Sequence, residues 1–229
     1  MATDKKIKKE ITGEWLSAFP SLKPYTQNKL YKIIGPFVTG LELIKLPRIE
    51  QYRPHFVLYP LYRNDVKSSL ESPCLMFEFY TVRKLQIHLP YDDRKQLYKN
   101  TQQLILQALK IQLVDDVELK ELYSLVDEQL LTDFLCQVNP GKRASLFEVK
   151  FNAALYTGNN NQMEEIIHQA EEESENWDMK AFETWRGKFD LWIKGLEDKM
   201  DQRDDFLFQI ATNKKDKKLS KLLFSELKA

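Results

Sequence analysis

Histidine and carboxylate side chains are the candidate metal ligands of this chain. Two of its three histidines, His55 and His88, lie in strand-like sequence, and Glu78 lies between them in the chain. Two imidazoles and one carboxylate form a ligand set that suits zinc or iron. The sequence has no HxH or HExxH spacing, so such a site depends on strands bringing distant residues together. We predict no bound metal or cofactor, and keep His55, Glu78 and His88 as the alternative.

The segment LFEVKF, residues 146–151, places Glu148 and Lys150 between large apolar side chains. This triplet resembles the ExK element of metal-dependent nucleases of the PD-(D/E)xK type. The resemblance implies that Asp133 and Glu148 hold Mg²⁺ while Lys150 assists the attacking water. That family carries its triplet on a strand, whereas the apolar spacing of RASLFEVKFNAALY favours a helix. On a helix, residues two apart point in different directions and do not share a metal.

Other catalytic signatures are missing from the sequence. It contains no GxSxG elbow and no glycine-rich phosphate-binding motif. Cys74 and Cys136 lie in apolar stretches without a neighbouring base, which is typical of buried thiols rather than of a disulfide framework or a zinc site. These features favour a protein that is not an enzyme.

The first ninety residues predict an N-terminal helix followed by an antiparallel meander of three or four strands. Apolar residues recur at helical spacing over residues 5–18, and the following FPSLKP ends that helix. YTQNKLYKII is either a short helix or the lead into a strand. PFVTGLELIKLP and HFVLYPLY have strand length, and Pro60 suggests an edge or a bulge. CLMFEFYTVRKLQIHLP is one long strand, or two strands that separate near Arg83 and Lys84.

After Pro90 the apolar spacing becomes helical, and the short connections predict five to seven helices in antiparallel hairpins. DMKAFETWRGKFDLWIKGLEDKM reads as one helix. The basic tail KKDKKLSKLLFSELK is expected to form an amphipathic helix that docks on a partner, or to lie against acidic helices of its own chain. The fold class is therefore α+β. Residues 1–90 hold the sheet and residues 91–229 hold the hairpins, packed as one compact unit.

Bulk composition describes a globular chain without an overall charge. It has 229 residues, 12% aromatic residues and a formal net charge of +0. That balance gives no general attraction to nucleic acid, although binding through the basic amino-terminal segment stays a third option. The sequence has neither a signal-peptide pattern nor an apolar run long enough to span a membrane. We therefore expect a soluble cytoplasmic protein without a membrane partner.

Charge is separated along the chain, and residues 164–205 are mainly acidic. With nearby aromatic residues, this region is the predicted surface for a protein partner, which would then be basic. The partner-binding candidates are Glu171, Glu172, Glu173, Trp177 and Trp185. The alternative is that the charges are solvated helix faces and the tryptophans pack in a core. The sequence thus predicts a non-enzymatic adaptor, regulator or toxin-neutralising immunity-type protein, with a metal-dependent nuclease as the alternative.

Overall fold

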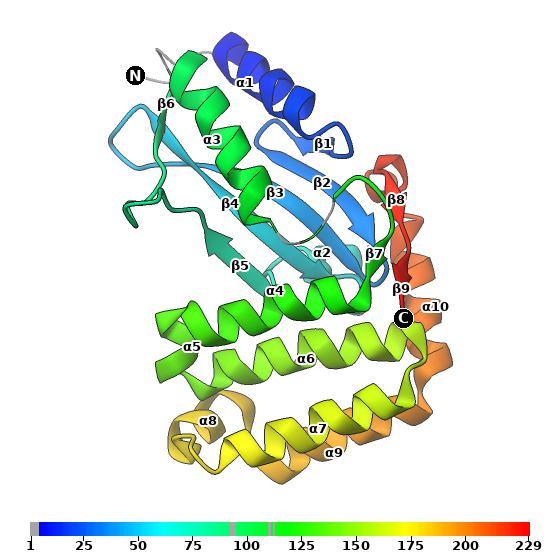
Figure 1. The fold of residues 1–229 in the computed structure, drawn as a ribbon. Coiled ribbons are helices and arrows are strands. Elements are labelled where there is room, and N and C mark those ends of the chain that lie inside the picture. Colours follow the sequence, from blue (N-terminus) through cyan, green and yellow to red (C-terminus); the bar gives the residue numbers. More distant parts are fainter. Residues whose placement is uncertain (1–4, 92–94, 110, 112) are drawn as a thin grey trace.

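The chain folds as an α+β protein with an N-terminal helix, an antiparallel meander and then a series of helices, as predicted (Figure 1). The computed structural model describes residues 5–91, 95–109, 111 and 113–229. Helix α1 spans Lys5–Ala18 and turns Ile11 and Trp15 into the core, which confirms the helix predicted from their spacing.

The first five strands form a meander in which each strand pairs with its predecessor in the chain. Strands β1 to β5 lie side by side in sequence order and every neighbouring pair is antiparallel. The segment YTQNKLYKII forms the β1–β2 hairpin, so the strand alternative is confirmed. The five strands are β1 (Lys23–Thr26), β2 (Lys29–Ile34), β3 (Phe37–Lys45), β4 (Gln51–Pro60) and β5 (Leu75–Glu78).

The last strand-like run divides in two, as the second alternative predicted. Strand β5 ends at Glu78, and β6 (Leu89–Pro90) returns to pair with the start of β4. Between them Lys84 turns the chain with a φ of 58°. The short helix α2 (Val66–Ser69) lies in the β4–β5 connection.

Pro60 does not mark an edge strand, so that expectation was wrong. Strand β4 is central, because it pairs with β3 along its length and with β5 and β6 on its other side. Its pairing with β5 stops at Leu58, and Pro60 is its last residue. A residue without an N–H is tolerated there because the ladder on that side has already ended.

The helices after the sheet form stacked layers, with α4, α6 and α7 side by side below the strands (Figure 1). Helix α6 is the most buried, and its ends carry clear signals: Asn139 caps its start and Gly158, at φ 74°, ends it. No helix in the described part of the chain combines the length and apolar character that crossing a bilayer requires. The helices are α3 (Lys95–Ala108), α4 (Leu119–Thr132), α5 (Phe134–Val138), α6 (Pro140–Thr157), α7 (Asn160–Ser174), α8 (Met179–Arg186), α9 (Phe189–Asp201) and α10 (Arg203–Lys214).

The expected single helix over residues 178–200 is two helices. Gly187 has φ 79° and ψ −168°, which stops α8, and α9 starts two residues later. The break changes the register of the aromatic residues on either side. As a result Trp192 is buried while Trp185 is 78% exposed.

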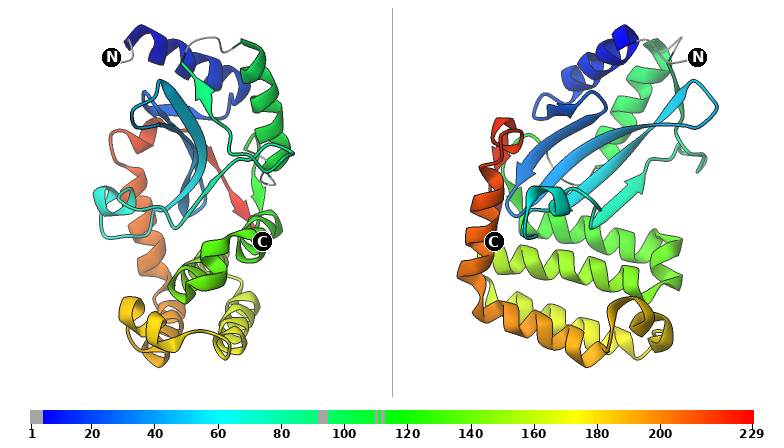
Figure 2. Two further views of the ribbon diagram at one scale, coloured as in Figure 1. Left: turned by 90° about the vertical axis from the view of Figure 1, so that its left-hand side faces the viewer. Right: turned by 180° about the vertical axis from the view of Figure 1, so that it is seen from behind.

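The expected amphipathic helix near the C-terminus is also wrong. After a 3-10 turn (Leu219–Lys221), β8 (Phe224–Ser225) pairs in parallel with β2, and β9 (Leu227–Lys228) pairs in parallel with β7 (Val117–Glu118). Buried Lys32 of β2 donates from Nζ to Ser225 Oγ at 2.6 Å and to the carbonyl of Leu113 at 2.7 Å. This segment is therefore built into the sheet and does not form a free helix (Figure 2).

The core joins the two regions of the sequence. One apolar cluster contains residues of α1, the sheet, α3, α4 and α6, while a second joins α6 to α7, α8 and α9. Trp15 is fully buried in the first cluster and donates from Nε1 to the Tyr52 hydroxyl at 3.0 Å. The other face of the sheet is covered by Ile210 of α10 and by Leu219.

A lysine held under the C-terminal segment makes stability depend on pH. The Lys214 ammonium lies 4.0 Å from the centroid of the Phe224 ring, and burial lowers its pKa to about 8 although Glu226 opposes the shift. Between pH 8 and its usual value of 10.5 the unfolded chain therefore binds more protons than the folded one. The free energy of unfolding should therefore rise with pH across this window. Below pH 8 Lys214 is charged in both states, so the full cost of burying its charge lowers the stability of the fold there.

Lys214→Met should remove this part of the rise. The measurement is urea unfolding at several pH values across that window, compared with wild type. If the free energy of unfolding rises equally with pH in both proteins, Lys214 is not the group responsible for the rise.

Candidate functional site

The structure brings the three candidate metal ligands into one cluster with an arginine inside it. Strand pairing sets His55 opposite Glu78, with His55 Nε2 3.3 Å from Glu78 Oε1. Arg53 donates to the same carboxylate oxygen at 2.5 Å, and its second terminal nitrogen lies 2.9 Å from His88 Nε2. The guanidinium therefore lies between the second imidazole and the carboxylate.

A guanidinium inside the cluster opposes a metal ion there. Burial alone would raise the pKa of Glu78, but hydrogen bonds and charge from Arg53, and then from His55, lower it below its usual value. The negative charge of the carboxylate is thus balanced by the protein itself. Across the described residues, no group of three or more His, Cys, Asp and Glu side chains is arranged to hold a metal ion. The cluster joins β4, β5 and the start of β6.

The ExK triplet lies in helix α6, as its spacing predicted, and its members bind separate partners. Glu148 accepts from Arg186 at 2.9 and 3.2 Å and from Trp192 Nε1 at 2.8 Å. Lys150 donates to Asp127 at 2.9 Å, and Asp133 accepts from Lys142 at 2.5 Å. These contacts join helices to one another, and they do not bring the three nuclease candidates to one point.

The predicted partner-binding set also divides. Glu171 and Glu172 are exposed on α7, whereas Glu173 forms an ion pair with Arg143 of α6. Trp177 is half-buried among aromatic rings. Those rings belong to Phe147, Phe182, Phe189 and Trp192. Trp185 is exposed.

A groove of about 790 Å³ lies between β5 and the corner formed by α4 and α5. Both faces of β5 contribute to it: Met76 and Glu78 point to one face and Phe77 to the other, and Phe79 follows the end of the strand. The edge of β5 therefore faces the groove. β5 is the last strand in the sheet order, and no described strand pairs with its outer edge. We call this feature the β5 groove.

The β5 groove has apolar walls and contains charged side chains of both signs. Met76 and Tyr80 are 43% and 49% exposed on the strand side, and Phe134 and Leu135 are 69% and 54% exposed on α5. Such a concentration of exposed apolar side chains is unusual for a surface without a partner. The charged residues that line the groove are Glu78, Glu128, Asp133 and Lys142, and the buried His55 also lines it.

Asp133 forms an ion pair with Lys142 in the lining of this groove. Burial would raise the pKa of Asp133, but the hydrogen bond from Lys142 and one from the backbone N–H of Leu135 lower it below its usual value. Its carboxylate is therefore ionised at neutral pH, and it also caps α5. The same contacts hold the start of α5, with its exposed Phe134 and Leu135, in place beside β5.

Sequence reasoning found single residues of this groove but not the groove. His55, Glu78 and Asp133 were candidates for unrelated sites. Phe134 and Leu135, which directly follow Asp133, were not among the candidate site residues. The local signal that could have indicated the β5 groove is the pair of large apolar side chains, Phe134 and Leu135, at a junction between two helices.

Comparisons with known proteins gave no match: neither a family model, nor a curated protein, nor a solved structure resembles this chain.

Proposed function

We propose that this protein binds another protein without catalysing a reaction, and that the β5 groove receives an extended segment of the partner. The open edge of β5 carries this proposal. An unpaired strand edge presents backbone N–H and C=O groups to an incoming strand, and the flanking side chains supply selectivity. Met76 and Tyr80 on one side and Phe134 and Leu135 on the other provide the apolar walls.

We infer a basic partner segment from the charged side chains of the groove. Three carboxylates and one ammonium group line it, and two of these carboxylates already have a cationic partner in the protein, Glu78 in Arg53 and Asp133 in Lys142. An extended segment directs alternate side chains to opposite sides, so a lysine or arginine flanked by apolar residues fits both the charges and the walls. A regulator, an adaptor or an immunity-type protein would use such a groove.

A cytoplasmic location belongs to the same proposal. It is supported by Cys74 and Cys136, which are both free thiols. The nuclease alternative receives no support from the separate partners of Asp133, Glu148 and Lys150.

Selection from a random peptide library on the full chain tests the proposal. Enriched peptides should carry a basic residue between apolar ones, and their binding should slow amide hydrogen exchange in β5 and α5. Phe134→Lys should weaken binding of an enriched peptide at least about tenfold, because it removes an apolar wall and repels the basic residue. Phe208→Lys is the matched control, since Phe208 is 72% exposed on α10, away from the groove.

Two outcomes would overturn this site. Binding that survives Phe134→Lys but fails in Trp185→Lys would move the interface to the acidic face of α7 and α8. Failure of both variants and the control alike would indicate non-specific apolar adsorption.

A further inference from the structure

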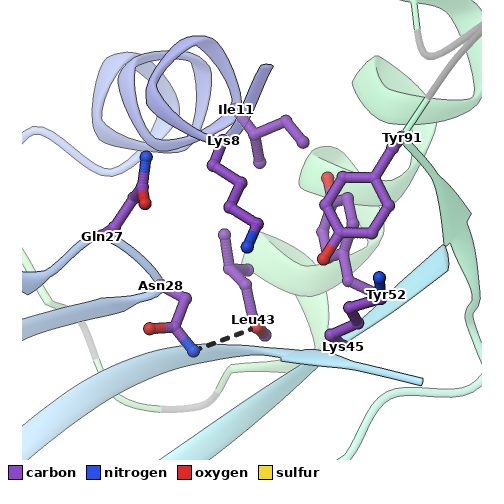
Figure 3. A pocket seen from close by; sticks show the side chains of 8 residues that line it. All are labelled: Lys8, Ile11, Gln27, Asn28, Leu43, Lys45, Tyr52 and Tyr91. Carbon is purple, nitrogen blue, oxygen red and sulfur yellow. Dashed lines mark hydrogen bonds between the residues drawn. The ribbon is translucent and has the colours of Figure 1, made fainter. Parts of the chain in front are cut away.

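A second cavity, built from other elements than the β5 groove, lies between α1 and the ends of β3 and β4 (Figure 3). Its volume is about 170 Å³. Helix α1 contributes Lys8 and Ile11, β3 contributes Leu43 and Lys45, and Tyr52 and Tyr91 close the far side. The β1–β2 turn adds Gln27 and Asn28 at the mouth.

The charges of this cavity have one sign. Among the described residues that line it, Lys8 and Lys45 are positive and none is acidic. Figure 3 shows the Lys8 side chain reaching from α1 toward the space above Leu43. Lys45 also pairs with Glu50 at 2.8 Å, outside the lining, and lies 5.9 Å from the centroid of the Tyr91 ring. Lys8 is therefore the main source of charge for a ligand, and Lys45 adds to it.

The floor of the cavity is apolar and fixed. Ile11, Leu43 and Tyr52 are each less than 5% exposed. The Tyr52 hydroxyl is held by Trp15 Nε1 at 3.0 Å, and Asn28 donates from its side-chain amide to the carbonyl of Leu43 at 3.5 Å. An apolar floor below two ammonium groups is complementary to a molecule with an apolar body and an anionic end.

The size of the cavity and its hydrogen-bond donors define the class of ligand more closely. An apolar cavity of about 150 Å³ accommodates a benzene ring, which is close to the volume found here. Burial, and then the charge of Glu50, raise the pKa of Tyr91, so its hydroxyl keeps its proton and can donate. The site thus combines one ring-sized space with two ammonium groups and a hydroxyl donor.

We propose that this cavity binds a small organic carboxylate whose body is about the size of one aromatic ring. The carboxylate accepts hydrogen bonds from Lys8, Lys45 and the Tyr91 hydroxyl, and the ring packs on Ile11, Leu43 and Tyr52. This site is independent of the β5 groove, and it adds a small-molecule ligand to a protein-binding function.

Calorimetric titration of the full chain with benzoate tests the site. Benzoate should bind one site with a Kd of about 1 mM or below. Benzamide has the same ring without the charge and should bind at least about tenfold more weakly, as should acetate, which lacks the ring. Lys8→Met should weaken benzoate binding by a similar factor and leave the far-ultraviolet circular dichroism spectrum unchanged.

Lys9→Met is the matched control because Lys9 is the next residue of α1, carries the same charge and is exposed. It should bind benzoate as wild type does. The proposal is overturned if benzoate shows no saturable binding, if benzamide binds equally well, or if the two lysine variants lose the same affinity. Peptide binding in the β5 groove should be the same in all these variants, so failure here does not affect that proposal.

Discussion

Replacing Gly40 with alanine is expected to lower the free energy of unfolding by more than about 4 kcal/mol, which places it among the most damaging single substitutions. Gly40 lies in β3 with a φ of 152°, which L side chains rarely adopt. A Cβ at this position would lie 2.0 Å from the carbonyl oxygen of Leu30 across the β2–β3 ladder. Both strands are buried and hydrogen-bonded on each side, so this oxygen cannot move away without breaking the sheet. Urea unfolding followed by circular dichroism measures the loss.

Gly13→Ala is the matched control for this prediction. Gly13 lies within α1, and a Cβ there meets no atom within 4 Å. Alanine restricts the unfolded chain and favours the helix, so this variant should gain about 0.5–1 kcal/mol of stability. Equal losses in the two variants would show that the effect arises from glycine replacement in general and not from the close approach of β2 and β3.

Glu148→Ala is the second substitution with a large expected effect, and we expect a loss of about 2–4 kcal/mol in the free energy of unfolding. The carboxylate accepts hydrogen bonds from Arg186 and from Trp192 Nε1, and it thereby joins α8 and α9 to α6. Removing it leaves an arginine and an indole N–H without this acceptor in a site where the ion-paired side chains are 25% exposed. Glu148→Gln should lose less, because its amide oxygen still accepts one of these bonds. Glu164→Ala, at an exposed position of α7, should change stability little.

The same protein pair distinguishes the helix-joining role of Glu148 from a metal-binding role. With the helix-joining role, Mg²⁺ leaves the melting temperature of wild type unchanged, and Glu148→Ala lowers it with or without the ion. Stabilisation by Mg²⁺ that disappears in Glu148→Ala would instead favour the nuclease alternative.

The sequence was most informative where local spacing determines the structure. The positions of Ile11 and Trp15 predict α1, and the apolar spacing around Glu148 and Lys150 predicts a helix in place of a nuclease strand. The sequence was misleading where contacts between residues far apart in the chain determine the local structure. Leu219, Leu222 and Leu223 have helical spacing, yet the chain beyond them is extended because β2 and β7 offer backbone partners.

The sites were less predictable because their residues are far apart in the chain. The cavity at α1 joins Lys8 to Lys45 and Tyr91, which requires the strand register to be known. The position of Arg53 beside the candidate metal ligands could have been predicted from the sequence. It lies two residues before His55 in a strand and therefore shares its face, so an arginine beside the candidate metal site was foreseeable. That single observation argues against a metal ion at His55 and Glu78.

The pairing of β8 with β2 has a consequence for how the protein is made. The ribosome synthesises β2 early, but β8, its parallel neighbour, is synthesised almost two hundred residues later. Until then the backbone of β2 at Ile33 and Ile34 lacks its parallel partner, and the Lys32 ammonium lacks its Ser225 acceptor. Completion of the sheet during translation is therefore delayed until residues 224 and 225 arrive, and chaperone protection should be most needed in that interval.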